Sequence, residues 1–145
     1  MPGVGKTTYA KELEKDLGAK HFSLDEMVYK EYGNKYEDGL DIREYAVKYS
    51  ALKEITERLR NKQVTLLDYG FFKKAERDWY RQLASDHDVE SEVHFVTADY
   101  DTQLERVLKR NQTVGNIHYI DKEILDFLIT LFEKPTDEDV VIVQT

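Results

Sequence analysis

The chain has 145 residues, 41% hydrophobic and 34% charged, which is the composition of an ordinary globular protein with room for one domain. A formal net charge of −8 disfavours a general nucleic-acid-binding surface, and the lack of cysteine excludes disulfides, thiolate metal sites and cysteine nucleophiles. No apolar run is long enough to cross a bilayer. We expect a single domain over residues 1–145, a reducing cytoplasm, and partners that are small molecules rather than nucleic acids or membranes.

In the first half of the chain, the spacing of apolar residues alternates between helical and strand periods. In chain order it predicts a helix over 6–17, a strand over 21–24, a weak helix through 32, a loop over 33–39 and a helix over 42–59. Gly18 is a natural stop for the first helix, and Asp25 ends the first strand. The last helix has the strongest stripe, formed by Ile42, Tyr45, Ala46, Tyr49, Leu52, Ile55, Thr56 and Leu59.

The second half continues this alternation. An uninterrupted apolar run over 64–67, followed by Asp68, is typical of a strand buried on both faces. The remaining predicted elements are a helix over about 71–83 with Phe72, Ala75, Trp79 and Leu83 on one side, a strand over 93–96, a helix through 110 with Thr102 and Glu105 as its capping box, an amphipathic helix around 124–132, and a strand over 140–143. Strands that alternate with helices predict an α/β fold with a mostly parallel sheet.

The chain opens on the pattern of a loop that binds nucleotide phosphates. Gly3 and Gly5 let backbone amides approach phosphate oxygens, and the helix that follows adds a partial positive charge. Lys6 would reach the β and γ phosphates, Thr7 would ligate Mg²⁺, and Thr8 would donate to the α phosphate. The alternative is a chance turn that caps a helix. We interpret the segment as an ATP-binding loop made of Gly3, Val4, Gly5, Lys6, Thr7 and Thr8.

The loop lacks part of the full motif. In Gly-x4-Gly-Lys-Ser/Thr the first glycine lies five residues before the second, so here it would fall one position before Met1. The strand that usually precedes the loop is also missing from this chain. We therefore expect the natural protein to begin earlier.

Two aspartates are candidates for the chemistry. Asp68, after an apolar strand, has the place of a carboxylate that steadies Mg²⁺, and its alternative is a bend through Tyr69 and Gly70. Asp25 follows the first strand at the edge where α/β sheets bind ligands. It could accept the proton of an attacking hydroxyl, or it could serve as a helix N-cap.

Arginines supply the candidate phosphate clamp. Arg106 and Arg110 are four residues apart on one predicted helix and could neutralise the charge of a moving γ-phosphoryl group. The alternative is a solvated helix face. Lys73, Arg77 and Arg81 form a second basic stripe, which we interpret as facing solvent, with contact to the substrate as the alternative.

Histidines and tyrosines are less informative. The four histidines show no ligand spacing, and we interpret His21 and His94, which lie in strand patterns, as structural. The segment with Tyr29, Tyr32 and Tyr36 either lines an acceptor pocket or covers the core.

Several motifs in this order resemble one family. They are Pro-Gly-Val-Gly-Lys-Thr-Thr at 2–8, Phe-Ser-Leu-Asp at 22–25, Leu-Leu-Asp-Tyr-Gly-Phe-Phe at 66–72, Glu-Arg-Asp-Trp-Tyr-Arg at 76–81, Glu-Arg-Val-Leu-Lys-Arg-Asn at 105–111 and Phe-Glu-Lys-Pro at 132–135. The chain is similar, over nearly its whole length, to the small AAA-domain ATP-binding proteins related to zeta toxin, chloramphenicol phosphotransferase and polynucleotide 5′-kinase. The resemblance implies the three-layer sandwich of P-loop NTPases.

The same resemblance implies roles for particular residues. Lys6 and Thr7 match the phosphate and Mg²⁺ residues, and Asp25 matches the general base that acts on the acceptor hydroxyl. Arg106 and Arg110 match the arginines of a lid whose mobile segment would be residues 111–118.

The leading hypothesis is an ATP- and Mg²⁺-dependent kinase that moves the γ-phosphate to a hydroxyl of a small-molecule acceptor. Three alternatives stay open: a polynucleotide 5′-hydroxyl kinase, a non-catalytic nucleotide-binding regulator, and a degenerate fold that binds no nucleotide. A guanine-nucleotide switch is disfavoured because Asp68-Tyr69-Gly70 has the wrong spacing and Asn61-Lys62-Gln63-Val64 lacks the expected aspartate.

Overall fold

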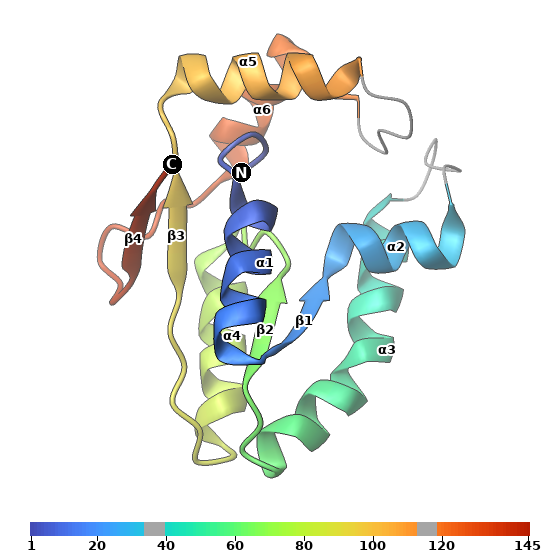
Figure 1. Ribbon diagram of the computed structural model, residues 1–145, viewed down its shortest axis with the longest axis vertical. Coiled ribbons are helices and arrows are strands. Elements are labelled where there is room, and N and C mark those ends of the chain that lie inside the picture. Colours follow the sequence, from blue (N-terminus) through green and yellow to red (C-terminus); the bar gives the residue numbers. More distant parts are fainter. Residues whose placement is uncertain (34–39, 113–118) are drawn as a thin grey trace. The chain divides into compact units, whose positions relative to one another are not determined.

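The computed structural model describes residues 1–33, 40–112 and 119–145. These residues form two compact units (Figure 1). The α1–β2 unit is Thr7–Tyr69, and the α4–β4 unit is Gly70–Thr145 together with Met1–Lys6. Each unit holds one pair of parallel strands and its own helices.

The elements follow the alternation that the sequence predicts. The first five are α1 (Lys6–Leu17), β1 (Lys20–Ser23), α2 (Leu24–Tyr32), α3 (Leu40–Arg60) and β2 (Thr65–Asp68). The next five are α4 (Lys74–Ser85), β3 (His94–Thr97), α5 (Tyr100–Asn111), α6 (Lys122–Leu131) and β4 (Val141–Gln144). The predicted bounds of α1 are confirmed, and the other elements begin or end within a few residues of their predicted positions. The loop predicted over 33–39 lies, from residue 34 on, outside the described residues.

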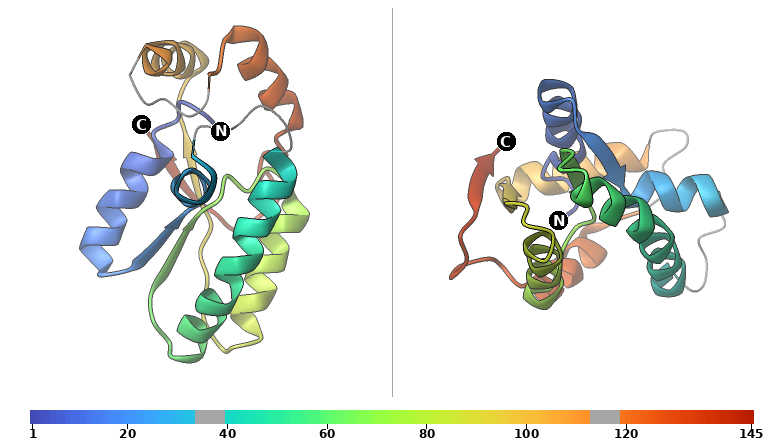
Figure 2. Two further views of the ribbon diagram at one scale, coloured as in Figure 1. Left: turned by 90° about the vertical axis from the view of Figure 1, so that its right-hand side faces the viewer. Right: turned by 90° about the horizontal axis from the view of Figure 1, so that it is seen from below.

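Parallel pairing is confirmed in both units. In the α1–β2 unit, β1 pairs with β2, and Figure 2 shows both strands from two further sides. Their register runs from Lys20↔Thr65 to Ser23↔Asp68. In the α4–β4 unit, β3 pairs with β4 from His94↔Val141 to Thr97↔Gln144. Because the strands of each pair run the same way, their carboxyl ends share one edge.

The first strand has the predicted length but begins and ends one residue earlier than predicted. The backbone turns into helix at Leu24, so Asp25 lies in the first turn of α2 and not at the end of a strand. Ser23 is the N-cap, although its side chain makes no capping hydrogen bond. Asp25 and Glu26 both lie near the amino end of α2, where a carboxylate interacts favourably with the helix dipole.

The prediction that β2 is buried on both faces is wrong. Val64 is exposed, the residues from Thr65 to Leu67 are half-buried, and only Asp68 is buried. Among the described residues β2 pairs with β1 alone, and a sheet of two strands leaves much of its surface open. An apolar run of four residues therefore does not distinguish a central strand from a partly open one.

The inward face of α3 also differs from the prediction. Its buried residues repeat every four positions, at Val47, Ala51, Ile55 and Leu59. The predicted stripe starts instead with Ile42, Tyr45 and Tyr49, and these side chains are exposed. At about 100° per residue they lie on the side of the helix opposite Val47 and Ala51. The pattern identified the helix correctly but misplaced its amino-terminal face.

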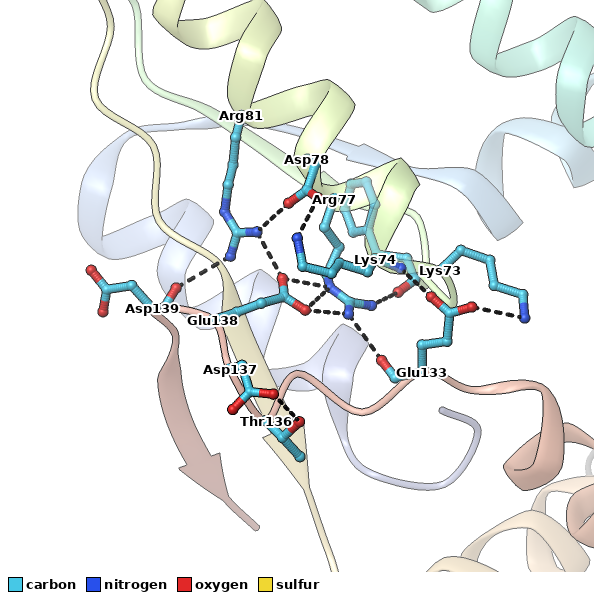
Figure 3. A network of polar contacts seen from close by, with 11 residues as sticks. Lys73, Lys74, Arg77, Asp78, Arg81, Glu133, Thr136, Asp137, Glu138 and Asp139 are labelled. Carbon is cyan, nitrogen blue, oxygen red and sulfur yellow. Dashed lines mark hydrogen bonds and ion pairs between the residues drawn. The ribbon is translucent and has the colours of Figure 1, made fainter.

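In the α4–β4 unit, the buried side of α4 carries an arginine and differs from the predicted apolar stripe. Trp79 is half-exposed, whereas Arg77 has a side chain that is only 3% exposed. The Arg77 guanidinium donates hydrogen bonds to both oxygens of Glu138 and to the carbonyls of Phe71 and Glu133 (Figure 3). A buried charge is tolerated where it is paired and hydrogen-bonded in this way.

Arg81, one turn further along α4, extends this network. Its guanidinium donates to Glu138 at 2.7 Å and to Asp78 at 3.1 Å. The prediction that the basic stripe of α4 faces solvent is therefore wrong for Arg77 and Arg81, while Lys73 is exposed and pairs with Glu133. The network fastens α4 to the segment that leads into β4.

Helices α5 and α6 enclose a small apolar cluster. Val107, Ile120 and Leu125 form its centre, and the residues packed against them are Met1, Tyr100, Leu104 and Leu128. The amino end of α5 is capped by Asp99, whose carboxylate accepts from the Thr102 amide at 2.8 Å, so the prediction that Thr102 is the cap is wrong. The described helices include none that is both long and apolar enough to cross a membrane.

The Arg77–Glu138 pair yields a prediction on stability. Glu138→Gln leaves Arg77 buried without its carboxylate, and breaking a buried pair in this way costs about 3–5 kcal/mol of unfolding free energy. Urea denaturation at pH 7 measures this loss. Exposed Glu90→Gln is the matched control and should change little. A Glu138→Gln variant as stable as its control would contradict the structural role of the pair.

The same pair predicts that the free energy of unfolding depends on pH. Hydrogen bonds from Arg77, followed by those from Arg81, lower the pKa of Glu138 from 4.5 to about 2. A lowered pKa in the folded state means that the contribution to stability is complete above the unfolded pKa and is lost as pH falls from 4.5 towards 2. Glu138→Gln should remove this part of the acid destabilisation, which denaturation curves at several pH values would reveal.

Candidate functional site

The glycine loop has a backbone that requires glycine. Gly3 and Gly5 adopt positive φ values of 75° and 78°. A Cβ on Gly3 would lie 2.6 Å from the carbonyl oxygen of Gln103, and one on Gly5 would lie 3.3 Å from the hydroxyl of Thr145. The first contact is impossible without a backbone shift. Glycine is therefore needed both for conformation and for close approach to α5, as a loop that presents backbone amides to phosphate requires.

The carbonyl groups of the loop are engaged within the α4–β4 unit. The Thr145 hydroxyl donates to the Val4 carbonyl at 2.9 Å. Arg106 donates to the Gly3 carbonyl at 3.2 Å and to the Thr145 hydroxyl at 2.8 Å. Val4 itself is buried. These bonds fix the shape of the loop before any ligand is considered.

The loop leads directly into α1. Lys6 is the first residue of this helix and Thr7 and Thr8 are the next two. The first amides of a helix have no carbonyl partner in the helix, and their partial positive charge attracts anions. The first turn of α1 contains no acidic residue that would compete for this position. The phosphate site over Gly3 to Thr8 stays a prediction, placed at the amino end of α1.

The two predicted Mg²⁺ residues meet in the α1–β2 unit. Thr7 Oγ1 donates to Asp68 Oδ2 at 3.1 Å, although the residues are 61 positions apart. The Asp68 side chain is only 2% exposed. A hydroxyl and one carboxylate suit Mg²⁺, which keeps most of its ligands as water and phosphate oxygens. Among the described residues there is no cluster of three or more acidic or histidine side chains that would form a metal cage.

Asp25 lies at the same edge of the β1–β2 pair as Asp68. Ser23 is paired with Asp68, and Asp25 follows it by two residues in the first turn of α2. The residue is exposed. Its neighbour Glu26 pairs with Lys11 at 2.9 Å, which ties α2 to α1. The carboxylate predicted as a base is thus accessible and near the predicted metal residue in the fold of this unit.

The predicted clamp arginines lie along α5 in the α4–β4 unit. Arg106 contacts the glycine loop directly, as described above. Arg110 is half-buried, and its Nε has no hydrogen-bond partner within residues 1–33, 40–112 and 119–145. The Asn111 side chain donates to the Ile120 carbonyl at 2.7 Å and accepts from its amide at 3.1 Å. The lid segment predicted over 111–118 lies, from residue 113 on, outside the described residues.

The structure thus groups the predicted residues in two sets. Gly3 to Lys6 and the two arginines belong to the α4–β4 unit, and Thr7, Asp25 and Asp68 belong to the α1–β2 unit.

Two residues at these sites were not found from the sequence. Thr145, which binds the loop, carries no motif, and no pattern along the chain indicates its contact. His21 lies against Asp68 although we interpreted it as merely structural. Strand alternation could have indicated that His21 lies near Asp68. His21 and Ser23 face the same side of β1, and Ser23 is paired with Asp68.

Comparison with known proteins identifies a family. A family model described as an AAA domain matches residues 1–135, which is nearly the whole chain. No curated protein matches the chain.

The fit of Gly3 against Gln103 can be tested by substitution. Gly3→Ala should weaken the affinity for ATP with Mg²⁺ at least about tenfold, equivalent to about 1.4 kcal/mol, because the new Cβ displaces the loop. Isothermal titration calorimetry measures this change. Gly18→Ala is the matched control, because Gly18 also has a positive φ, of 59°, but no atom within 4 Å of a new Cβ.

The control should lose about 1 kcal/mol of unfolding free energy from backbone strain and keep its ATP affinity. Equal ATP affinities for wild type and Gly3→Ala would show that the close approach is not needed for the loop to bind phosphate.

Proposed function

The chain belongs to the AAA-domain family, and from this premise we propose that it binds ATP with Mg²⁺ and transfers the γ-phosphate to a hydroxyl of a small-molecule acceptor. The observation that carries the proposal is the contact between the Thr7 hydroxyl and the buried Asp68 carboxylate. It supports a Mg²⁺ site formed by Thr7, at the end of the phosphate loop, and Asp68. Kinship with zeta toxin, chloramphenicol phosphotransferase and polynucleotide kinase, the three-layer P-loop sandwich and a cytoplasmic location are part of the proposal.

The chain would bind the nucleotide through its phosphates. The amides between Gly3 and Thr8 would face phosphate oxygens, Thr8 would bind the α phosphate, and the Lys6 ammonium would reach the β and γ phosphates. Thr7 and Asp68 would hold Mg²⁺, which when bound neutralises charge on the same phosphates. An acidic chain can bind a polyanion in this way, since the positive groups are local.

Transfer would require a base and a charge clamp. Asp25 is exposed at the edge of the β1–β2 pair that also carries Asp68, so an acceptor hydroxyl can reach it. Its carboxylate would take the hydroxyl proton while the oxygen attacks the γ phosphorus, and the bond between the γ phosphorus and the β,γ-bridging oxygen would break so that ADP leaves. Arg106 and Arg110 would neutralise the charge that develops on the phosphoryl group, and the bond from Arg106 to the Gly3 carbonyl supports a place beside the loop.

Lys6→Ala tests nucleotide binding. Removal of the ammonium should weaken ATP affinity by about 10–100-fold, because a hydrogen bond to a charged group is worth about 1.5–3 kcal/mol. Calorimetric titration with ATP and Mg²⁺ measures the change. Lys15→Ala, an exposed position on the same helix, is the control and should bind like wild type. Undiminished binding by Lys6→Ala would refute the phosphate role of the loop.

Asp25→Asn tests the chemical step. The variant should keep the ATP affinity of wild type and lose about 10²–10⁴ in the rate of phosphoryl transfer, because an amide cannot accept the proton. Labelled ATP and a panel of hydroxyl acceptors measure the rate. Glu31→Gln, exposed on the same helix, should transfer normally. Normal transfer by Asp25→Asn would eliminate this residue as the base.

The same panel separates the alternative functions. Preference for oligonucleotides with a 5′-hydroxyl would identify a polynucleotide kinase, and tight ATP binding without transfer to any acceptor would identify a regulator. If the wild-type chain binds no ATP, the remaining alternative is a degenerate fold that binds no nucleotide.

A further inference from the structure

His21 lies between two carboxylates within the α1–β2 unit. Its Nδ1 is 3.5 Å from Glu14 Oε2, and its Nε2 is 3.9 Å from Asp68 Oδ2. Glu14 comes from α1, His21 from β1 and Asp68 from the end of β2. The imidazole is therefore a neighbour of the carboxylate that we assign to Mg²⁺.

The two sides of the ring differ in their access to water. The His21 side chain is 4% exposed, while the Glu14 side chain is 43% exposed. On the Nδ1 side the ring thus faces a carboxylate that solvent reaches. Nε2 is buried and has no hydrogen-bond partner within residues 1–33, 40–112 and 119–145, since its contact with Asp68 is longer than a hydrogen bond. A buried polar nitrogen without a partner needs an explanation.

Local geometry explains why these groups meet. His21 and Ser23 point to one face of β1, and Ser23 is paired with Asp68 on the neighbouring strand. On α1, Thr7 and Glu14 are seven residues apart and so lie on the same side of the helix. This side of α1 contacts Asp68 through Thr7 and His21 through Glu14. The helix and both strands thus converge on the Asp68 carboxylate.

We propose that His21 is a positioning residue for Asp68, a role that rests on the proposed function. With hydrogen on Nε2 the ring is a donor 3.9 Å from Oδ2, the oxygen that also accepts from Thr7. A shift of under 1.5 Å closes this contact to hydrogen-bond length. The bond would hold the carboxylate in one orientation and leave its other oxygen available to help hold Mg²⁺. Groups that hold metal-binding carboxylates in this way typically contribute 10–100-fold to metal affinity or activity.

The coupling between Mg²⁺ and ATP tests the role of His21. For each variant of the full chain, the affinity for ATP is measured in EDTA and again with saturating Mg²⁺. The affinity with Mg²⁺ divided by the affinity in EDTA is then compared with the same ratio for wild type. His21→Leu should leave the metal-free affinity unchanged and lower the ratio by about tenfold or more. His21→Gln places an amide nitrogen near the position of Nε2 and should restore the ratio to within about threefold of wild type.

Two controls separate this role from other effects. Glu14→Gln alters only the water-accessible side of the ring and should keep the wild-type ratio. His94→Leu removes a strand histidine of the other unit, one that contacts Glu92, and should also keep it. An unchanged ratio in His21→Leu overturns the proposal, and so does a loss of metal-free affinity equal to the loss with Mg²⁺.

A measurement on the wild-type chain covers the case in which His21→Leu does not fold. Nitrogen-15 spectra of the imidazole, recorded with ATP and Mg²⁺, should show the hydrogen of His21 on Nε2. A ring with hydrogen on Nδ1 alone overturns the proposal. Failure of the proposed function is distinguishable: a wild-type chain that binds no ATP removes the nucleotide site itself, and one that binds ATP without transfer leaves the test of His21 intact.

Discussion

The hydrogen bond between Thr7 and Asp68 is the constraint on which the α1–β2 unit depends. It joins the first turn of α1 to the carboxyl end of β2, and so fixes where the helix that follows the glycine loop lies on the strand pair. A carboxylate that is 2% exposed is costly unless it is hydrogen-bonded or binds a cation. Thr7 donates to this carboxylate, and a cation beside it is the proposal made above.

Sequence patterns predicted the order and type of the elements because these depend on neighbours within a few residues. They failed where a contact is distant along the chain. Arg77 is buried because Glu138, 61 residues later, neutralises it, and no local pattern shows that pairing. Trp79 is more apolar than Arg77, yet its side chain is half-exposed. On α3, tyrosines were counted with the aliphatic residues although their hydroxyls tolerate water, and the predicted face was misplaced.

Residues of the candidate site could be predicted from the sequence where they belong to short motifs. The glycines, Lys6 and Thr7 follow from the loop pattern, and Asp68 follows from its strand. What the patterns could not give is the second reason for the glycines, their close approach to Gln103 and Thr145, because both partners lie far along the chain. Asp25 was assigned to the correct edge but to the wrong element, since the helix begins one residue before it.

Charge explains why the proposed chemistry needs each of these parts. ATP and the carboxylates of Asp25 and Asp68 are all negative, and an acidic chain offers no general attraction for a polyanion. The loop amides, Lys6 and the arginines of α5 counter this repulsion with the ligand, but the carboxylate of Asp68 itself can be reconciled with phosphate only by a cation between them. The orientation of that one carboxylate then determines how strongly Mg²⁺ and ATP favour each other. In the proposed mechanism the buried imidazole of His21, 3.9 Å from this carboxylate, would act on that coupling between Mg²⁺ and ATP.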